Sequence, residues 1–142
     1  MPEASVRVAR QKQSTASKRA TFERLKLKPR LSREVLLKMP NEDGHLEEVS
    51  LLFKSIGSLE YDRLLTKNPP NTEQKAEGNS YNIHTFAPSL LAKVCTEPEM
   101  SEEEWSEIWN SPDWNRGEVM QLFMSAVEIC NQGMEVPPTE AV

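Results

Sequence analysis

The side chains of this chain that could carry out chemistry are few and lie far apart in the sequence. The two histidines are His45 and His84, and the two cysteines are Cys95 and Cys130. A zinc site needs closely spaced pairs of such ligands, and nucleophilic catalysis needs a base held beside the nucleophile. Neither pattern occurs here. We therefore expect solvated histidines, reduced thiols as in the cytosol, and a protein that is not an enzyme and uses no metal or cofactor.

One run of carboxylates, Glu102 to Glu104, could be taken for a metal-binding cluster. It directly follows Ser101, and the pattern Ser-x-x-Glu forms the capping box at the start of many helices. Acidic side chains in the first turn also favour the positive end of the helix dipole. We therefore interpret this run as the start of a helix. Phosphate-binding glycine motifs of the GxxxxGK[ST] and GxGxxG types are absent from the sequence.

Charge is distributed unevenly along the 142 residues. Residues 1–33 contain ten Lys or Arg against Glu3 and Glu23, whereas the whole chain has a formal net charge of −5. The first segment has few large apolar side chains, so its burial cannot offset the entropy lost on folding. We expect residues 1–32 to form a basic, disordered arm, which either binds an acidic partner or only solubilises the chain. Its single aromatic, Phe22, counts against base stacking and so against nucleic acid as a partner.

Two apolar segments on either side of a turn predict a small β-hairpin after the arm. Apolar side chains alternate along residues 33–39 and, less regularly, along about 46–53. Between them lie Asp43 and Gly44, a pair typical of tight turns because it tolerates positive φ. The imperfect alternation of the second segment leaves a helix from Leu46 onward open as an alternative.

Beyond the hairpin, helix caps and helix-breaking residues divide the chain into four to five short helices. Ser58 is the expected N-cap of the first helix, and Gly78 ends the second. The third helix is expected within the segment from Tyr81 to Cys95, with Pro88 in its first turn, and Asn115 is expected to cap the last helix. In the last helix Val119, Leu122, Phe123, Ala126, Val127 and Cys130 recur at spacings of three and four, which predicts one buried face. The fold class is mainly α (α+β).

Large apolar side chains are concentrated in the last two helices. Trp105 and Trp109 lie four residues apart and share one helical face. Tryptophans of this kind form either the core or an aromatic groove that holds an amphipathic helix of another protein. Methionines nearby make such a surface adaptable. The candidate partner-binding residues are Trp105, Ile108, Trp109, Trp114, Met120, Phe123 and Met124.

An ordered series of short motifs between Tyr61 and Glu118 resembles the tail assembly chaperones of long-tailed bacteriophages (siphophages), in particular those common in phages of actinobacteria. The resemblance covers about residues 50–131. The matching pieces are Tyr61-Asp62-x-Leu64, Pro69-Pro70-x-Thr72, Tyr81-Asn82, Thr85-Phe86-Ala87-Pro88-x-Leu90, Glu97-Pro98, Ile108-Trp109 and Trp114-x-x-Gly117-Glu118.

This resemblance implies a chaperone domain over residues 33–132, between the basic arm and a flexible C-terminal tail over residues 133–142. Proteins of this family bind the tape measure protein, keep it soluble and promote assembly of the tail tube around it. The implied partners are the tape measure and tail tube proteins, with self-association left open. The implied location is the host cell cytoplasm late in infection, and not the mature virion. Many such genes also yield a longer product by frameshifting, which a flexible tail would permit.

Two functions from other classes remain as alternatives. One is a structural virion component, such as part of the head–tail connector. The other is a nucleic-acid-binding phage protein that uses the basic arm. Nothing in the sequence indicates a membrane partner, since no run of eighteen apolar residues occurs.

Overall fold

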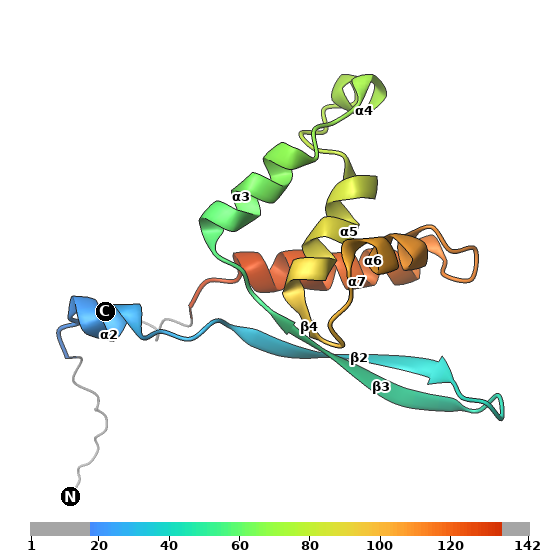
Figure 1. The fold of residues 1–142 in the computed structure, drawn as a ribbon, viewed down its shortest axis with the longest axis horizontal. Helices are drawn as coiled ribbons and strands as arrows, with labels where there is room; N and C mark the ends of the chain where they lie inside the picture. The colour runs from blue at the N-terminus through green and yellow to red at the C-terminus, as the bar shows by residue number, and fades with distance from the viewer. Residues whose placement is uncertain (1–17, 135–142) are drawn as a thin grey trace, which may run out of the picture.

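The computed structural model describes residues 18–134, in which six helices accompany one three-stranded antiparallel sheet (Figure 1). This is the α+β fold that the sequence predicted. Five of the helices follow the hairpin, also as predicted. In chain order the elements are α2 (Phe22–Lys26), β2 (Ser32–Pro40), β3 (Leu46–Lys54), α3 (Ser58–Lys67), α4 (Thr72–Ala76), α5 (Ile83–Val94), β4 (Cys95–Glu97), α6 (Glu102–Trp109) and α7 (Arg116–Asn131).

The predicted hairpin is confirmed, and the alternative helix from Leu46 does not form. Strands β2 and β3 pair without interruption over nine residues each. At the turn, Oδ1 of Asn41 accepts hydrogen bonds from the backbone N–H groups of Asp43 and His45, at 2.9 and 3.1 Å. Gly44 has a φ of 81°, a conformation that side chains with a Cβ rarely adopt. The local turn chemistry therefore fixes the register of the hairpin.

The third strand, β4, was not predicted, because Cys95 was assigned to the preceding helix. Helix α5 ends at Val94, and the backbone of Cys95 is extended where it pairs with Phe53 of β3. The hydroxyl of Thr96 donates a hydrogen bond of 3.2 Å to the carbonyl oxygen of Leu52. Strand β3 is thus the central strand and β2 an edge strand. A strand of three residues is too short to show an alternation of apolar and polar side chains. It can therefore be recognised only from its pairing with a neighbouring strand.

Side-chain caps begin the last two helices as predicted. The Ser101 hydroxyl accepts a hydrogen bond from the Glu104 N–H at 3.1 Å, and the Glu104 carboxylate accepts one from the Ser101 N–H at 2.9 Å. Asn115 and Glu118 form the same reciprocal box at the start of α7. The N-cap of α3 is Gly57, one residue before the predicted Ser58, and it makes no side-chain hydrogen bond.

Pro88 lies in the interior of α5, not in its first turn as predicted. The helix begins earlier, at Ile83, because Oδ1 of Asn82 accepts a hydrogen bond of 3.0 Å from the His84 N–H. The Asn82 backbone N–H in turn donates to the carbonyl oxygen of Asn68 at 2.8 Å, which fixes this helix start against the end of α3. Pro88 is buried at the sixth position, where it cannot donate the usual hydrogen bond to the carbonyl oxygen of His84.

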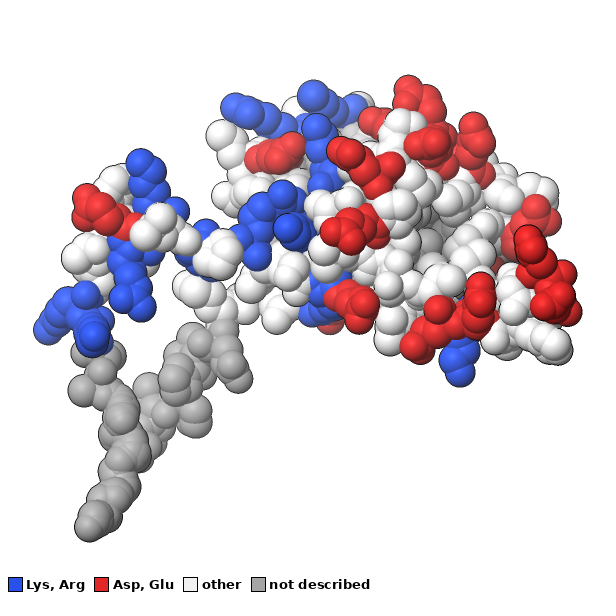
Figure 2. All heavy atoms as spheres, turned by 60° about the horizontal axis from the view of Figure 1, so that its bottom comes forward, with Lys and Arg blue, Asp and Glu red and all other residues white. Residues whose placement is uncertain are grey.

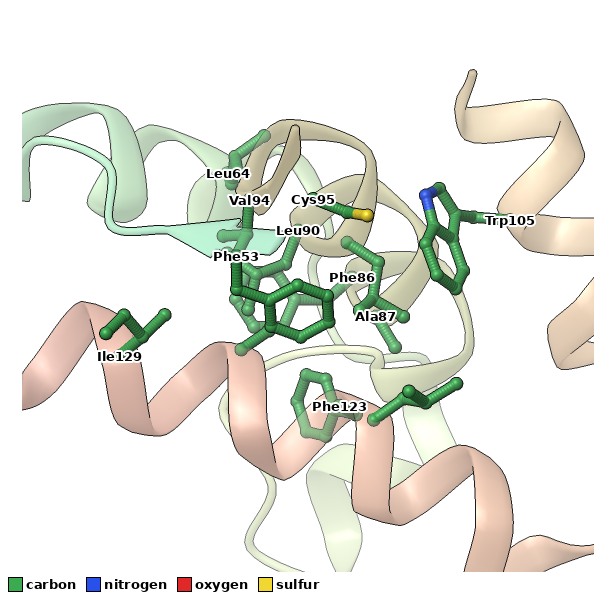
Figure 3. Packing of buried hydrophobic residues seen from close by; sticks show 13 residues of the cluster. Phe53, Leu64, Phe86, Ala87, Leu90, Val94, Cys95, Trp105, Phe123 and Ile129 are labelled. Carbon is green, nitrogen blue, oxygen red and sulfur yellow. The ribbon is translucent and has the colours of Figure 1, made fainter. Parts of the chain in front are cut away.

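Helix α5 forms the centre of the core, since it contacts α3, α6, α7 and β4 (Figure 3). The ring of Phe53 lies between α5 and α7. On α7 the buried face differs from the predicted one at its end, because Ile129 is buried and Val127 and Cys130 are half-buried. The clustered core residues are Phe53, Leu64, Phe86, Ala87, Leu90, Leu91, Val94, Cys95, Trp105, Leu122, Phe123, Ala126 and Ile129.

The described part of the basic arm contains a helix that the sequence analysis did not predict. Thr21 caps α2 by accepting a hydrogen bond of 3.2 Å from the Arg24 N–H. No residue of α2 is buried, and the helix stands apart from the rest of the chain (Figure 1). Residues 1–17 of the predicted arm, and most of the predicted tail over 133–142, lie outside the described residues. Over residues 18–134, no helix is long and apolar enough to cross a membrane.

Candidate partner-binding surfaces

The seven candidate partner-binding residues are divided between the core and the surface. Trp105 and Phe123 are each only 2% exposed, so they belong to the core and present no surface to another protein. Met124 is 53% exposed and lies on the outer side of α7. The other four residues, Ile108, Trp109, Trp114 and Met120, are half-buried and pack against the core with part of each side chain accessible.

Met120 and Met124 lie one helical turn apart on α7, beside the buried Phe123. Trp109 of α6 packs edge-on against the ring of Phe123, with ring centroids 6.1 Å apart. The indole N–H of Trp109 donates a hydrogen bond of 3.2 Å to Nδ1 of His84, which fixes the orientation of the ring. We refer to Trp109, Met120 and Met124 as the methionine face. It combines one held aromatic ring with two flexible thioether side chains.

Trp114 lies in a different place, in a cleft between β2 and the start of α7. The cleft has a volume of about 430 Å³. Strand β2 contributes one wall, and the turn before α7 together with the first half of α7 contributes the other. We refer to this hollow as the β2–α7 cleft, and the residues that line it are Leu36, Leu37, Lys38, Met39, Pro40, Asp113, Trp114, Glu118 and Gln121. The sequence analysis missed the strand wall, because no local pattern connects β2 with a tryptophan so far along the chain.

On the face of the molecule shown in Figure 2, charged side chains are distributed unevenly along the long axis. Acidic side chains gather at the end that carries the hairpin turn and the α6–α7 turn, and basic ones gather toward α2 (Figure 2). Asp113 and Glu118 line the β2–α7 cleft, with Lys38 as the one basic side chain among the lining residues. The adjoining hollow at the hairpin turn adds Glu42, Asp43 and Glu47. The lining of the cleft therefore combines apolar side chains with a net negative charge.

The cysteines are held in the thiol form by their surroundings. Burial raises the pKa of Cys95 to about 11, and its Sγ donates a hydrogen bond of 3.2 Å to the carbonyl oxygen of Pro98. Burial also raises the pKa of Cys130. Both are free cysteines. Because the thiolate is the reactive species, neither side chain is activated as a nucleophile at neutral pH.

The histidines lie apart from these thiols. His84 is engaged by Trp109, and His45 lies at the hairpin turn. Among residues 18–134, no three His, Cys, Asp or Glu side chains converge in a way that would hold a metal ion.

The motifs that resemble tail assembly chaperones meet in the interior of the fold. The ring of Phe86 packs edge-on against Tyr61 at 5.8 Å, Tyr81 at 5.0 Å and Phe123 at 5.9 Å between centroids. Trp109 extends this aromatic cluster through Phe123. Residues from four of the seven motif pieces therefore belong to one aromatic cluster. Comparison of the chain with protein-family models, curated proteins and solved structures finds no match.

Proposed function

We propose that this protein is a phage tail assembly chaperone, which binds the tape measure protein, keeps it soluble and promotes tail tube assembly around it. The proposal is supported chiefly by the ordered motif series from Tyr61 to Glu118. Residues from four of its pieces, Tyr61, Tyr81, Phe86 and Trp109, belong to one aromatic cluster in the fold. Motifs that occur in the same order as in the family, and whose residues pack together, are better explained by a shared fold than by unrelated short matches.

The methionine face is the surface we assign to the tape measure protein. The partner is long and helical in this family, and its helices carry apolar stripes that aggregate when uncovered. An amphipathic helix binds another protein by laying its apolar face against such a surface. Methionine side chains adapt to irregular partners, so one face can cover successive helical stretches of different sequence. Binding is then reversible, as it must be if tube subunits are to replace the chaperone.

The acidic exterior is consistent with the same role. The net charge of −5 makes complexes that are coated with this protein repel one another. This repulsion keeps coated complexes dispersed. We place this action in the host cytoplasm, late in infection, with the protein absent from the finished virion. A longer frameshifted product that recruits tail tube protein remains part of the proposal, and the tail from which it would extend lies largely outside the described residues.

Co-expression with the tape measure gene, followed by affinity purification, tests the proposal. We expect the wild-type protein to retain tape measure protein in the soluble fraction and to co-purify with it. Met124→Lys should lose both effects, because it places a charge on the most exposed side chain of the methionine face. Leu59→Lys is the matched control: Leu59 is 62% exposed on α3, away from this face, and the variant should behave as wild type.

The outcomes separate the function from its assigned surface. If the wild-type protein neither solubilises nor co-purifies tape measure protein, the proposed function is wrong. If Met124→Lys still does both, the methionine face is not the binding surface. Mass spectrometry of purified phage particles supplies a second test. Near absence of the protein agrees with a chaperone, whereas a stoichiometric amount identifies a structural component such as a connector protein.

A further inference from the structure

We propose that the α2 segment of one copy binds in the β2–α7 cleft of a second copy, so that the protein associates head to tail. Among residues 18–134, no apolar side chain covers the apolar side chains of helix α2. Phe22, Leu25 and Leu27 are 69%, 64% and 79% exposed. Phe22 and Leu25 lie three residues apart and therefore on one side of the helix. A short helix that exposes large side chains to this extent is stabilised when another surface covers them.

The charges of the two surfaces are complementary. Residues 18–28 carry Lys18, Arg19, Arg24, Lys26 and Lys28 against Glu23, a net charge of +4. The cleft carries Asp113 and Glu118 against Lys38, and the adjoining hairpin turn carries Glu42, Asp43 and Glu47. A basic segment with exposed apolar side chains is thus complementary to a cleft that combines apolar side chains with a net negative charge.

In this structure, a copy's own α2 lies away from its own cleft. The chain is fixed just after this segment, because the Arg30 side chain donates a hydrogen bond of 2.6 Å to the carbonyl oxygen of Ser55, and the Ser55 N–H donates one of 2.9 Å to Leu31. Three residues separate α2 from Arg30, so the end of α2 stays within roughly 14 Å of it. The middle of the cleft, at Lys38, lies eight residues further along the extended chain, roughly 26 Å away. The two surfaces also lie toward opposite ends of the molecule (Figure 1).

The resulting contact joins two different surfaces, since each copy offers one α2 segment and one cleft. Contacts of this kind do not end with a pair but continue into rings or filaments. The methionine face takes no part in the contact and stays free on every copy. The inference does not depend on the proposed function, because association requires only the protein itself.

Sedimentation of the purified full-length protein, freed of nucleic acid, tests the inference. We expect the wild-type mass to rise with concentration at low salt and to fall at high salt, because screening weakens the charge contact. Phe22→Ser/Leu25→Ser and, separately, Met39→Lys/Asp113→Lys should each raise the dissociation constant by at least roughly tenfold. All four side chains are exposed, so the fold should be unaffected. Leu59→Ser, on an uninvolved surface, should associate as wild type.

Mixing the two double variants gives the sharpest result. The variant with the α2 substitutions (the arm variant) retains an intact cleft, and the variant with the cleft substitutions (the cleft variant) retains an intact α2. In a mixture, α2 of the cleft variant can therefore bind the cleft of the arm variant, whereas the opposite contact is disrupted on both sides. We expect each variant alone to be a monomer and the mixture to form heterodimers without larger species. A wild-type protein that stays monomeric at low salt would overturn the inference. So would an arm variant that associates as strongly as wild type, or a mixture that remains monomeric.

Discussion

Replacement of Phe86 by alanine should remove a large part of the stability of this domain. Phe86 is 1% exposed and packs edge-on against Tyr61, Tyr81 and Phe123. Phe→Ala substitutions in cores cost about 3–5 kcal/mol, and each aromatic pair adds about 0.5–1.5 kcal/mol beyond the buried area. With three such pairs lost, we expect a cost near the upper end, about 4–5 kcal/mol. Domains of this size have about 5–15 kcal/mol of unfolding free energy in total.

Urea unfolding followed by tryptophan fluorescence measures this cost. With a slope of about 2 kcal/mol per molar urea, a loss of about 4 kcal/mol lowers the midpoint by roughly 2 M. Phe22→Ala is the matched control, since it removes the same ring from a position that is 69% exposed. It should change the unfolding free energy by less than about 0.5 kcal/mol. A Phe86→Ala cost below about 1.5 kcal/mol would refute the view that this ring joins the motifs into one core.

Two further predictions follow from the caps and the buried thiol. Asn115→Ala removes the side chain that caps α7 and should lower the unfolding free energy by about 1 kcal/mol, whereas Gln121→Ala, on the exposed side of the same helix, should not. Cys95 has a pKa near 11 in the folded protein and near 9.0 when unfolded, so the folded state binds its proton more tightly. The contribution of this thiol to the unfolding free energy is therefore complete below pH 9 and is lost as the pH rises toward 11. Cys95→Ala should abolish this part of the pH dependence. Unfolding midpoints measured from pH 7 to 11 decide this, and a wild-type decline no steeper than that of the variant would contradict it.

The parts of the fold that depend on neighbouring residues could be predicted from the sequence. The hairpin turn at Gly44 and the capping boxes at Ser101 and Asn115 are local, so their residues suffice to identify them. The start of α5 could not be placed, because it is fixed by the contact of Asn82 with Asn68 across the intervening loop. Strand β4 could not be found for the same reason, since it forms only where it meets β3.

The candidate surfaces show a similar limit. Helical spacing places Met120 and Phe123, three residues apart, on the same side of α7, but spacing cannot tell the middle of a buried face from its edge. Phe123 is therefore core, while Met120 remains partly accessible. Trp114 was grouped with the other tryptophans because it is close to them in sequence. In the fold it lies against β2, which comes from a distant part of the chain.

The most direct test of the central claim is whether the purified protein prevents aggregation of purified tape measure protein. Tape measure protein is diluted from denaturant, with or without the protein present, and light scattering is followed over time. We expect the wild-type protein, and Leu59→Lys equally, to suppress scattering at a fixed ratio of copies to tape measure chain, while Met124→Lys does not. Scattering that the wild-type protein leaves unchanged, even in large molar excess, would contradict the claim that this protein is a tape measure chaperone.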